Sequence, residues 1–356
     1  MVSIIASALG VGVGVGVRTG PIATTASTHA SSVIKHLVLS GGASHGLMEI
    51  GALSYLSSRR FYERKNIQTI HATSVGSIVG SLIALDVPWE HVRNYVVDRP
   101  WDKVFSLDIP KLITAGNLHA LYSKDCFSQI LTPLLKSCDL SPDISLEELY
   151  GYTNIHLNFY SVRLPSMELA RLSHETEPHM RFVDAVQATC AIPLIFPPLI
   201  YNGHFYIDGG VYNNYPLREC VREVRDDTHE SPLDEILGIT FEPEDILSTE
   251  SETYQKLLNP ETHNIPDFLY LLLRSVLSAN RKQTKSFQEI PYEVLLPNNR
   301  ITLDSLTEFI YTKKARADFL DLGERIAKEH WDRWTATAPP PTSDGTPPES
   351  SSVVQM

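Results

Sequence analysis

Ser74 has the local pattern of a nucleophile. It stands in the run Ala72-Thr73-Ser74-Val75-Gly76, between a predicted strand at residues 67–72 and a predicted helix at 77–85. A serine on such a sharp turn presents its hydroxyl above the sheet, and small residues at Ala72 and Gly76 let the backbones approach. A small-x-Ser-x-Gly run also arises by chance, so the motif gains weight only from its surroundings.

A glycine-rich loop precedes this serine in the chain. The run Gly41-Gly42-Ala43-Ser44-His45-Gly46 follows a predicted strand at residues 35–40 and opens a predicted helix at 46–56. Backbone N–H groups in such a loop can form a concave nest for an oxyanion or a phosphate. A dinucleotide site would need glycine at Ala43 and an acidic residue closing a second strand about 20 residues on. Glu63 has that spacing but lies in a charged stretch, which counts against a nucleotide site. Nucleotide binding and a plain packing turn are the two alternatives to an oxyanion loop.

Asp208 offers a carboxylate that a serine nucleophile could use. It ends a predicted strand and is followed by Gly209 and Gly210. An Asp-Gly-Gly turn often uses its carboxylate only to cap backbone N–H groups. The functional alternative is a carboxylate that lies beside Ser74 and accepts the proton of the attacking hydroxyl.

Alternating strands and helices predict the scaffold for these residues. Two strand–turn–helix units within residues 35–85 indicate a parallel sheet covered by helices. Further strands are predicted at 155–164, 169–174, 235–241 and 292–296, with a hairpin or edge strand at 201–208. Helices are predicted at 182–190, 265–280 and 307–330. Residues 86–150 are interpreted as a more helical insertion or subdomain packed on the sheet.

Composition and charge limit the classes of function. The chain has 356 residues, 43% of them hydrophobic and 20% charged, and a formal net charge of -12. This acidity argues against nucleic acid as a partner and against electrostatic docking on anionic membranes, but it leaves apolar contact with a membrane surface open. Four cysteines without a C-x-x-C pair favour reduced thiols and a cytoplasmic location, or one peripheral to a membrane. The sequence carries no indication of the oligomeric state.

The two ends of the sequence differ from the rest. Residues 1–32 predict a flexible tail rich in Gly, Ala and Ser, and a membrane anchor or cleaved signal is the less favoured alternative because a basic start is missing. Residues 335–356 are rich in Pro, Ser and Thr and are predicted to be disordered. Between the tails, we expect a core at 33–217 that is completed by residues 218–334.

The order of these motifs resembles the patatin-like phospholipase family. Three segments around the motifs are also similar to the family's: Leu39-Ser40-Gly41-Gly42 with Ile50-Gly51-Ala52-Leu53, residues 188–198, and residues 208–217. The resemblance covers about residues 35–217. It implies an α/β fold, a three-layer sandwich with a mostly parallel central sheet flanked by helices. It also implies a lipid acyl ester hydrolase of the phospholipase A or lipase type, acting on a lipid or phospholipid ester.

By this resemblance, Ser74 and Asp208 form a Ser-Asp dyad that works through an acyl-enzyme, with no cofactor. The resemblance places the oxyanion hole at Gly41, Gly42, Ala43, Ser44 and Gly46, and the supports of the elbow and the turn at Ala72, Gly76, Gly209 and Gly210. Ala72 and Ala43 stand where the family usually has glycine. A positive φ at either alanine would cost about 1 kcal/mol or more. A catalytically weak or inactive lipid-binding protein is therefore the alternative.

Two histidines raise rival arrangements. A Ser-His-Asp triad would use His71, but its place on the strand before Ser74 favours packing in the core or on a sheet face. His45, where Arg or Lys is common in the family, is interpreted as a solvated loop side chain or as a contact to a lipid head group. No EF-hand loop or H-E-x-x-H motif is present, so no metal site is predicted. The apolar helix predicted at 265–280 is interpreted as buried rather than as a lid.

Overall fold

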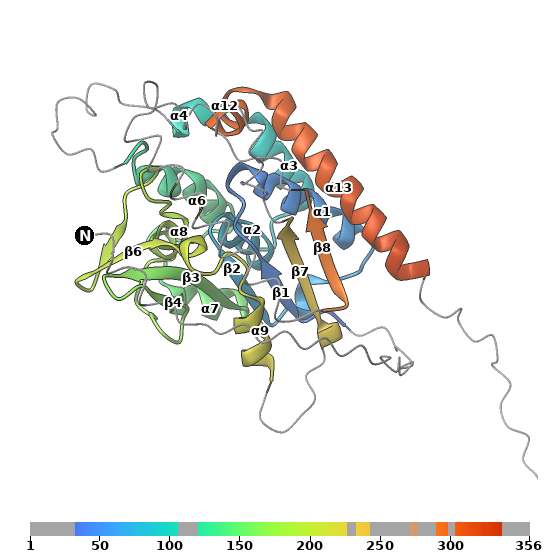
Figure 1. Ribbon diagram of the computed structural model, residues 1–356, viewed down its shortest axis with the longest axis horizontal. Helices are drawn as coiled ribbons and strands as arrows, with labels where there is room; N and C mark the ends of the chain where they lie inside the picture. The colour runs from blue at the N-terminus through green and yellow to red at the C-terminus, as the bar shows by residue number, and fades with distance from the viewer. Residues whose placement is uncertain are drawn as a thin grey trace, which may run out of the picture. The chain divides into compact units, whose positions relative to one another are not determined.

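A mostly parallel β-sheet organises the described part of the chain (Figure 1). The computed structural model describes residues 33–105, 120–225, 233–242, 290–297 and 303–336, with Leu272 and Ser275. The predictions for the tail at 1–32, for the tail beyond residue 336 and for most of the helix at 265–280 lie outside the described residues. All described elements belong to one compact unit, Ser32–Met356.

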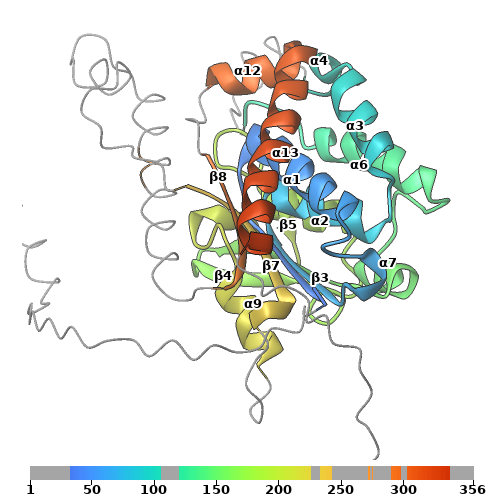
Figure 2. The same cartoon turned by 90° about the vertical axis from the view of Figure 1, so that its right-hand side faces the viewer.

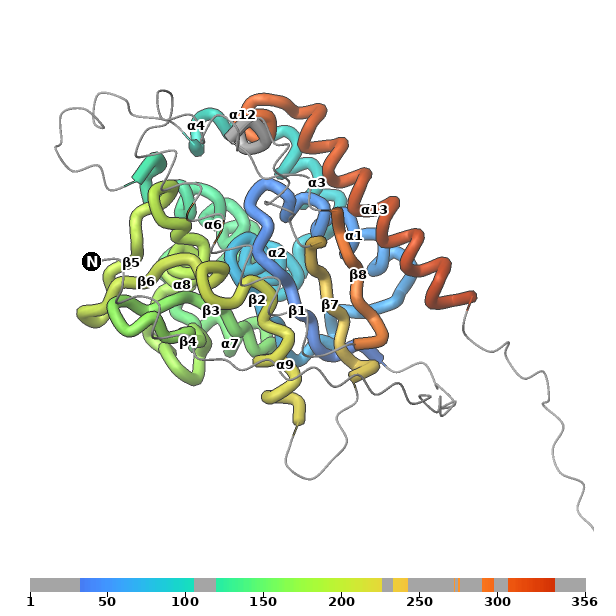
Figure 3. The backbone as a smooth tube through the Cα atoms, in the orientation of Figure 1, coloured from blue at the N-terminus to red at the C-terminus, as the bar shows by residue number. Residues whose placement is uncertain are grey.

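Five strands form the parallel part of the sheet. They are β1 (His36–Leu39), β2 (Thr69–Thr73), β3 (His156–Leu164), β7 (Ile236–Phe241) and β8 (Tyr292–Leu296), in the order β3-β2-β1-β7-β8. Figure 3 shows β1 beside β7, although the two are far apart in the sequence. Strands β1, β2 and β7 are buried along their whole length, as expected for parallel strands that are covered on both faces.

Three antiparallel strands extend the sheet. They are β4 (Glu168–Leu172), β5 (Leu199–Tyr201) and β6 (His204–Asp208), where β4 and β6 both pair with β3, and β5 pairs with β6. The hairpin formed by β5 and β6 agrees with the hairpin or edge strand predicted at 201–208.

Helices cover both faces of the sheet. Alternation along β1 turns Leu37 and Leu39 toward α1 (Gly46–Ser58) and α2 (Val75–Ala84) in the larger hydrophobic core. It turns Val38 the other way, toward α9 (Leu217–Val224) in a smaller core. Figure 2 shows α9 apart from the group formed by α1, α2 and α3 (Trp89–Asp98). The predicted three-layer sandwich is confirmed.

The described helices of the region at residues 86–150 share the larger core with α1 and α2. They are α3, α4 (Trp101–Val104), α6 (Asp125–Ser137) and α7 (Leu146–Thr153). The side chains of Val92, Trp101, Leu131 and Leu149 are buried in the same cluster as those of α1 and α2. Helix α8 (Phe182–Cys190) also lies on this face and has the predicted bounds.

The closing helix is broken in two, which corrects the prediction of one helix at 307–330. Helix α12 (Leu303–Tyr311) ends before Thr312, and α13 (Lys313–Ala336) runs beyond the predicted tail boundary at residue 335. The break lets α12 lie over α4 while α13 packs along α1. Among the described helices, none combines the length and apolar character needed to cross a bilayer.

Candidate active site

Strand β3 brings Ser74 and Asp208 together. In its register, Tyr160 pairs with Thr73 at the end of β2, and the next residue, Ser161, pairs with Asp208 at the end of β6. Because β4 occupies the other edge of β3, β2 and β6 meet end to end along one edge. The residue that follows β2 and the residue that ends β6 therefore lie side by side, although they are 134 positions apart.

Ser74 has the geometry of a nucleophile elbow. Its backbone has φ 54° and ψ -131°, in the region that side chains rarely adopt, and it forms the N-cap of α2. The backbone N–H donates to Thr189 Oγ1 at 2.9 Å. The hydroxyl donates to Asp208 Oδ2 at 2.8 Å, and the side chain is only 6% exposed. This arrangement directs the hydroxyl proton at the carboxylate.

Asp208 acts both as a turn cap and as the partner of the serine. Its Oδ1 accepts the N–H of Gly210 at 2.7 Å, and its own N–H donates to Ala191 O at 2.9 Å. The second oxygen is thereby left facing Ser74. The residue is 2% exposed, so the carboxylate is held in a fixed place away from bulk solvent.

The glycine-rich loop lies against the nucleophile. A Cβ added to Gly41 would lie 2.9 Å from the Cβ of Ser74, so a larger residue would push the loop away. Gly41 donates its N–H to Asn214 O at 2.9 Å, and Asn214 Nδ2 donates to Gly41 O at 2.6 Å. These two bonds tie the loop to the segment that follows Asp208.

The loop turns into a short 3₁₀ helix, Ala43–His45, before α1 begins. The N–H groups of His45 and Gly46 donate within this turn, to Gly42 O and to Ala43 O respectively. With the N–H of Gly41 also engaged, the backbone donors that remain as candidates for an oxyanion are those of Gly42, Ala43 and Ser44.

The two alanines of the motif differ in their backbone. Ala43 has φ 47°, in the left-handed region that favours glycine. Ala72 lies within β2 and pairs in regular register with Leu39 and Phe159, so no positive φ is required there. Gly76 supports the elbow by close approach, because a Cβ there would lie 2.7 Å from the carbonyl oxygen of Leu39.

The two histidines near the motif, His45 and His71, are both buried. The ring of His71 is fully buried, its Nδ1 lies 2.9 Å from the hydroxyl of Tyr160, and burial lowers its pKa to about 3. This agrees with the packing role preferred from the sequence. His45 is 1% exposed and packs near the rings of Phe319 and Phe241, so the interpretation as a solvated loop side chain is wrong.

Cys190 is another potential nucleophile near the dyad. It is buried, and its Sγ lies 3.8 Å from Ser77 Oγ. Burial, together with the charge of nearby Asp208, raises the pKa of the Cys190 thiol well above its usual range. The thiol therefore stays protonated and does not compete with Ser74.

Sequence reasoning missed two residues that position the site. Thr189 accepts the N–H of Ser74 and donates its own hydroxyl to Tyr160 O. Asn214 holds Gly41. Both lie in the segments that carried the family resemblance, at 188–198 and 208–217, so the segments were found but the roles of these side chains were not.

Two relatives of the chain are named as a probable lipid hydrolase and a lysophospholipase. The chain is 29% identical over 191 residues to a probable lipid hydrolase of Invertebrate iridescent virus 6, covering 53% of this chain and 63% of the viral protein. It is 25% identical over 194 residues to a lysophospholipase of Meyerozyma guilliermondii, covering 52% of this chain and 12% of that protein. The chain thus spans less than two thirds of either relative.

A solved structure and a family model extend the comparison. VipD from Legionella pneumophila has a similar fold, with a TM-score of 0.50 and 14% sequence identity, over 85% of this chain and 67% of that chain. The family model of patatin-like phospholipases matches residues 37–221, a segment that contains the glycine-rich loop, Ser74 and Asp208. The chain belongs to the patatin-like phospholipase family.

Proposed function

We propose that the chain hydrolyses acyl esters of lipids, with Ser74 as the nucleophile and Asp208 as its base. The observation that carries the proposal is the 2.8 Å hydrogen bond from Ser74 Oγ to Asp208 Oδ2, in a chain of this family. A hydroxyl that already donates to a fixed carboxylate can pass on its proton without a histidine.

The reaction follows from this geometry. Ser74 Oγ attacks the ester carbonyl while its proton moves to Asp208, and the alcohol leaves with that proton. Water then attacks the acyl-enzyme, gives its proton to Asp208, and releases the fatty acid as Ser74 takes the proton back. The carbonyl oxygen becomes negative in both steps. The N–H groups of Gly42, Ala43 and Ser44 are the proposed donors to it, and losing one such donor typically costs about 3 kcal/mol.

The lipid class is a further part of the proposal. The relatives are named a lipid hydrolase and a lysophospholipase, which supports a carboxylic ester of a lipid or phospholipid as the substrate. A phospholipase A or lipase activity is the form that we propose to screen first.

The β5–β6 hairpin is the surface that we propose to contact lipid. Ile200 and Phe205 are register partners in the β5–β6 hairpin and are 67% and 47% exposed, on the strand pair that ends at Asp208. Serine at both positions should weaken co-sedimentation with phosphatidylcholine vesicles while hydrolysis of a soluble ester persists. Unchanged vesicle binding would argue against this surface.

The test of the dyad is release of p-nitrophenol from a short acyl ester, with fluorophosphonate labelling in parallel. We expect wild-type protein to react and be labelled, Ser74→Ala to lose both, and Asp208→Asn to lose at least about a hundredfold in rate. His71→Gln is the matched control and should retain activity. Loss in His71→Gln with retention in Asp208→Asn would overturn the Ser-Asp assignment.

The alternative is a lipid-binding protein with weak or no catalysis. The observation in its favour is the positive φ of Ala43, at a loop position where the family usually has glycine. Vesicle binding by folded protein that shows neither turnover nor labelling would support it. In that case Ala43→Gly should relieve the backbone, and recovered turnover would identify this alanine as the cause.

A further inference from the structure

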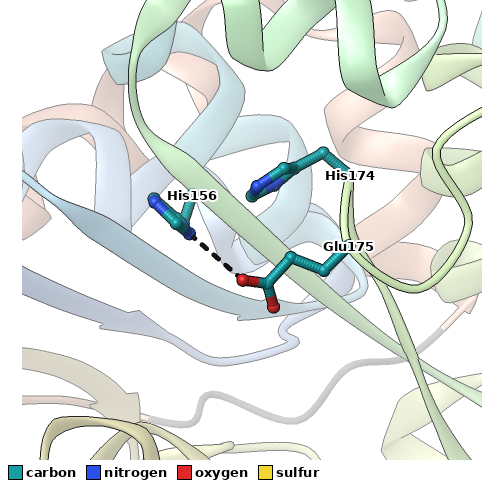
Figure 4. Close-up of side chains that lie close together, drawn as sticks. All are labelled: His156, His174 and Glu175. Atoms are coloured by element: carbon teal, nitrogen blue, oxygen red, sulfur yellow. Dashed lines mark ion pairs between the residues drawn. The ribbon is translucent and has the colours of Figure 1, made fainter.

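Three metal-ligating side chains converge at the end of β3 that lies far from the active site. His156 begins β3, while His174 and Glu175 follow β4, and their potential ligand atoms all lie within 4.8 Å of one another. Figure 4 shows the imidazole of His174 and the carboxylate of Glu175 directed toward the ring of His156. His156 Nδ1 lies 4.0 Å from Glu175 Oε1, which is too long for a hydrogen bond.

Neighbouring side chains hold these groups in place. Arg171 donates to Glu175 Oε2 at 2.8 Å, so Oε1 is the oxygen turned toward His156. The ring of Tyr150 stacks on His174, with ring centroids 3.8 Å apart and an interplanar angle of 11°. It also meets His156 edge-on at 4.7 Å. A hydrogen bond such as that from Arg171 is typical of a ligating carboxylate. The contacts with Tyr150 fix the planes of the two imidazole rings.

The polar groups of the cluster are incompletely satisfied. His174 Nδ1 is buried and has no hydrogen-bond partner among the described residues. A buried polar atom of this kind costs free energy unless a ligand or another group binds it. The side chains of His156 and Glu175 are 34% and 48% exposed, so an ion can enter from solvent.

We propose that His156, His174 and Glu175 bind a divalent transition metal ion of the zinc type. Two imidazoles and one carboxylate suit zinc, whereas magnesium and calcium prefer sites made of oxygen ligands alone. Metal–ligand bonds of about 2.0–2.1 Å place tetrahedral ligands about 3.4 Å apart. The ligand atoms, which lie within 4.8 Å of one another, therefore need to approach by up to about 1.4 Å, and solvent water fills the fourth position.

This site is distinct from the Ser74–Asp208 dyad and has a structural role. His156 pairs with Thr69 at the start of β2, whereas the dyad lies beyond Thr73 at its other end. The ion joins the first residue of β3 to the loop after β4. It therefore stabilises the two strands that carry the antiparallel part of the sheet, and it takes no part in ester hydrolysis.

The test uses purified full-length protein that has been stripped with EDTA and then freed of the chelator. Titration with zinc chloride in a calorimeter should show one equivalent bound. At a 100-fold excess over Kd, the Tm of the wild type should rise by roughly 3–5 °C. The double variant His156→Asn, His174→Asn should lose both effects, and Glu175→Gln should weaken Kd at least about tenfold.

His179→Asn is the matched control, because His179 lies nearby on the surface with its side chain 86% exposed, outside the cluster. It should bind zinc as the wild type does. Circular dichroism checks that each variant is folded, and Glu175→Gln keeps the test decisive if the double variant is not. Absence of a zinc equivalent in the wild type, or equal binding by Glu175→Gln and the wild type, would overturn the proposal.

Discussion

One side chain, Thr189, connects the strained backbone of Ser74 to β3. It accepts the N–H of Ser74 and donates to the carbonyl oxygen of Tyr160, and all three groups are buried. A positive φ at a serine is costly, and such a conformation persists only where its surroundings fix it. The hydroxyl of Thr189 is therefore as much a part of the elbow as the glycine at position 76.

We predict that Thr189→Val destabilises the protein by about 1–3 kcal/mol and lowers kcat roughly tenfold or more. Valine keeps the shape but leaves a buried N–H and a buried carbonyl without partners. Urea unfolding and ester hydrolysis measure the two effects. Thr189→Ser retains the hydroxyl and should stay close to wild type. Equal behaviour of the valine and serine variants would show that this hydroxyl does not hold the elbow.

Asn214 has the corresponding role for the glycine-rich loop. We predict that Asn214→Ala lowers kcat about tenfold with little change in KM, because the loop of oxyanion donors loses its bond at Gly41 O. Asn213→Ala is the control, since the side chain of Asn213 donates to Glu219 instead and is similarly buried. Rates that fall equally in the two variants would point to general loosening of the turn.

Local patterns predicted the central residues of the candidate site and the glycines of its turns, but not the side chains that hold them. Ser74, Gly76 and Asp208 are marked by short-range rules for sharp turns, which act within a few residues. The partners Thr189 and Asn214 meet Ser74 and Gly41 only in the folded chain, across 115 and 173 positions. The same reason explains His45, whose burial depends on Phe241 and Phe319 from distant elements.

At the scale of elements, the strands were predicted and their pairing was not. The apolar runs marked β1, β2, β3 and β7 within a few residues, because a buried parallel strand is apolar along its length. The end-to-end meeting of β2 and β6 on one edge of β3 depends on register, which no local pattern specifies. The break between α12 and α13 was also missed, because no proline or glycine marks it in the sequence.

The contact between α1 and α13 depends on two glycines. A Cβ on Gly51 would meet the backbone carbonyl of Leu320, and a Cβ on Gly323 would meet that of Met48. Neither carbonyl can move without shifting a whole helix. We predict that Gly323→Ala destabilises the fold by about 1–3 kcal/mol, as is usual for overpacking of a tight interior.

Gly151 is the matched control for this prediction. It lies in α7, and a Cβ there would have no neighbour within 4 Å. Gly151→Ala should therefore stabilise the protein by about 0.5–1 kcal/mol, because alanine favours a helix. Chemical denaturation of the two variants and of wild type measures both changes in the free energy of unfolding, a decrease for Gly323→Ala and an increase for Gly151→Ala. A neutral Gly323→Ala would mean that the two helices separate without cost.

At the scale of the whole molecule, buried histidines couple stability to pH. Burial lowers the pKa of His36 to about 4 and that of His71 to about 3, and both lie on strands inside the sheet. An unfolded histidine titrates near 6.5. Between pH 6.5 and the lowered values, the unfolded chain binds protons that the folded chain does not. Stability is therefore full above pH 6.5 and is lost as the pH falls.

We predict that these two groups together remove about 4 kcal/mol of stability between pH 7.5 and pH 5, about 2 kcal/mol each. That is a large part of the 5–15 kcal/mol typical of a folded domain. Urea unfolding at the two pH values measures the loss. The double variant His36→Gln, His71→Gln keeps hydrogen-bonding groups facing Thr69 and Tyr160 but cannot take up protons. Between pH 7.5 and pH 5, the double variant should lose about 4 kcal/mol less stability than wild type does. An equal loss in the two proteins would show that other groups cause the acid sensitivity.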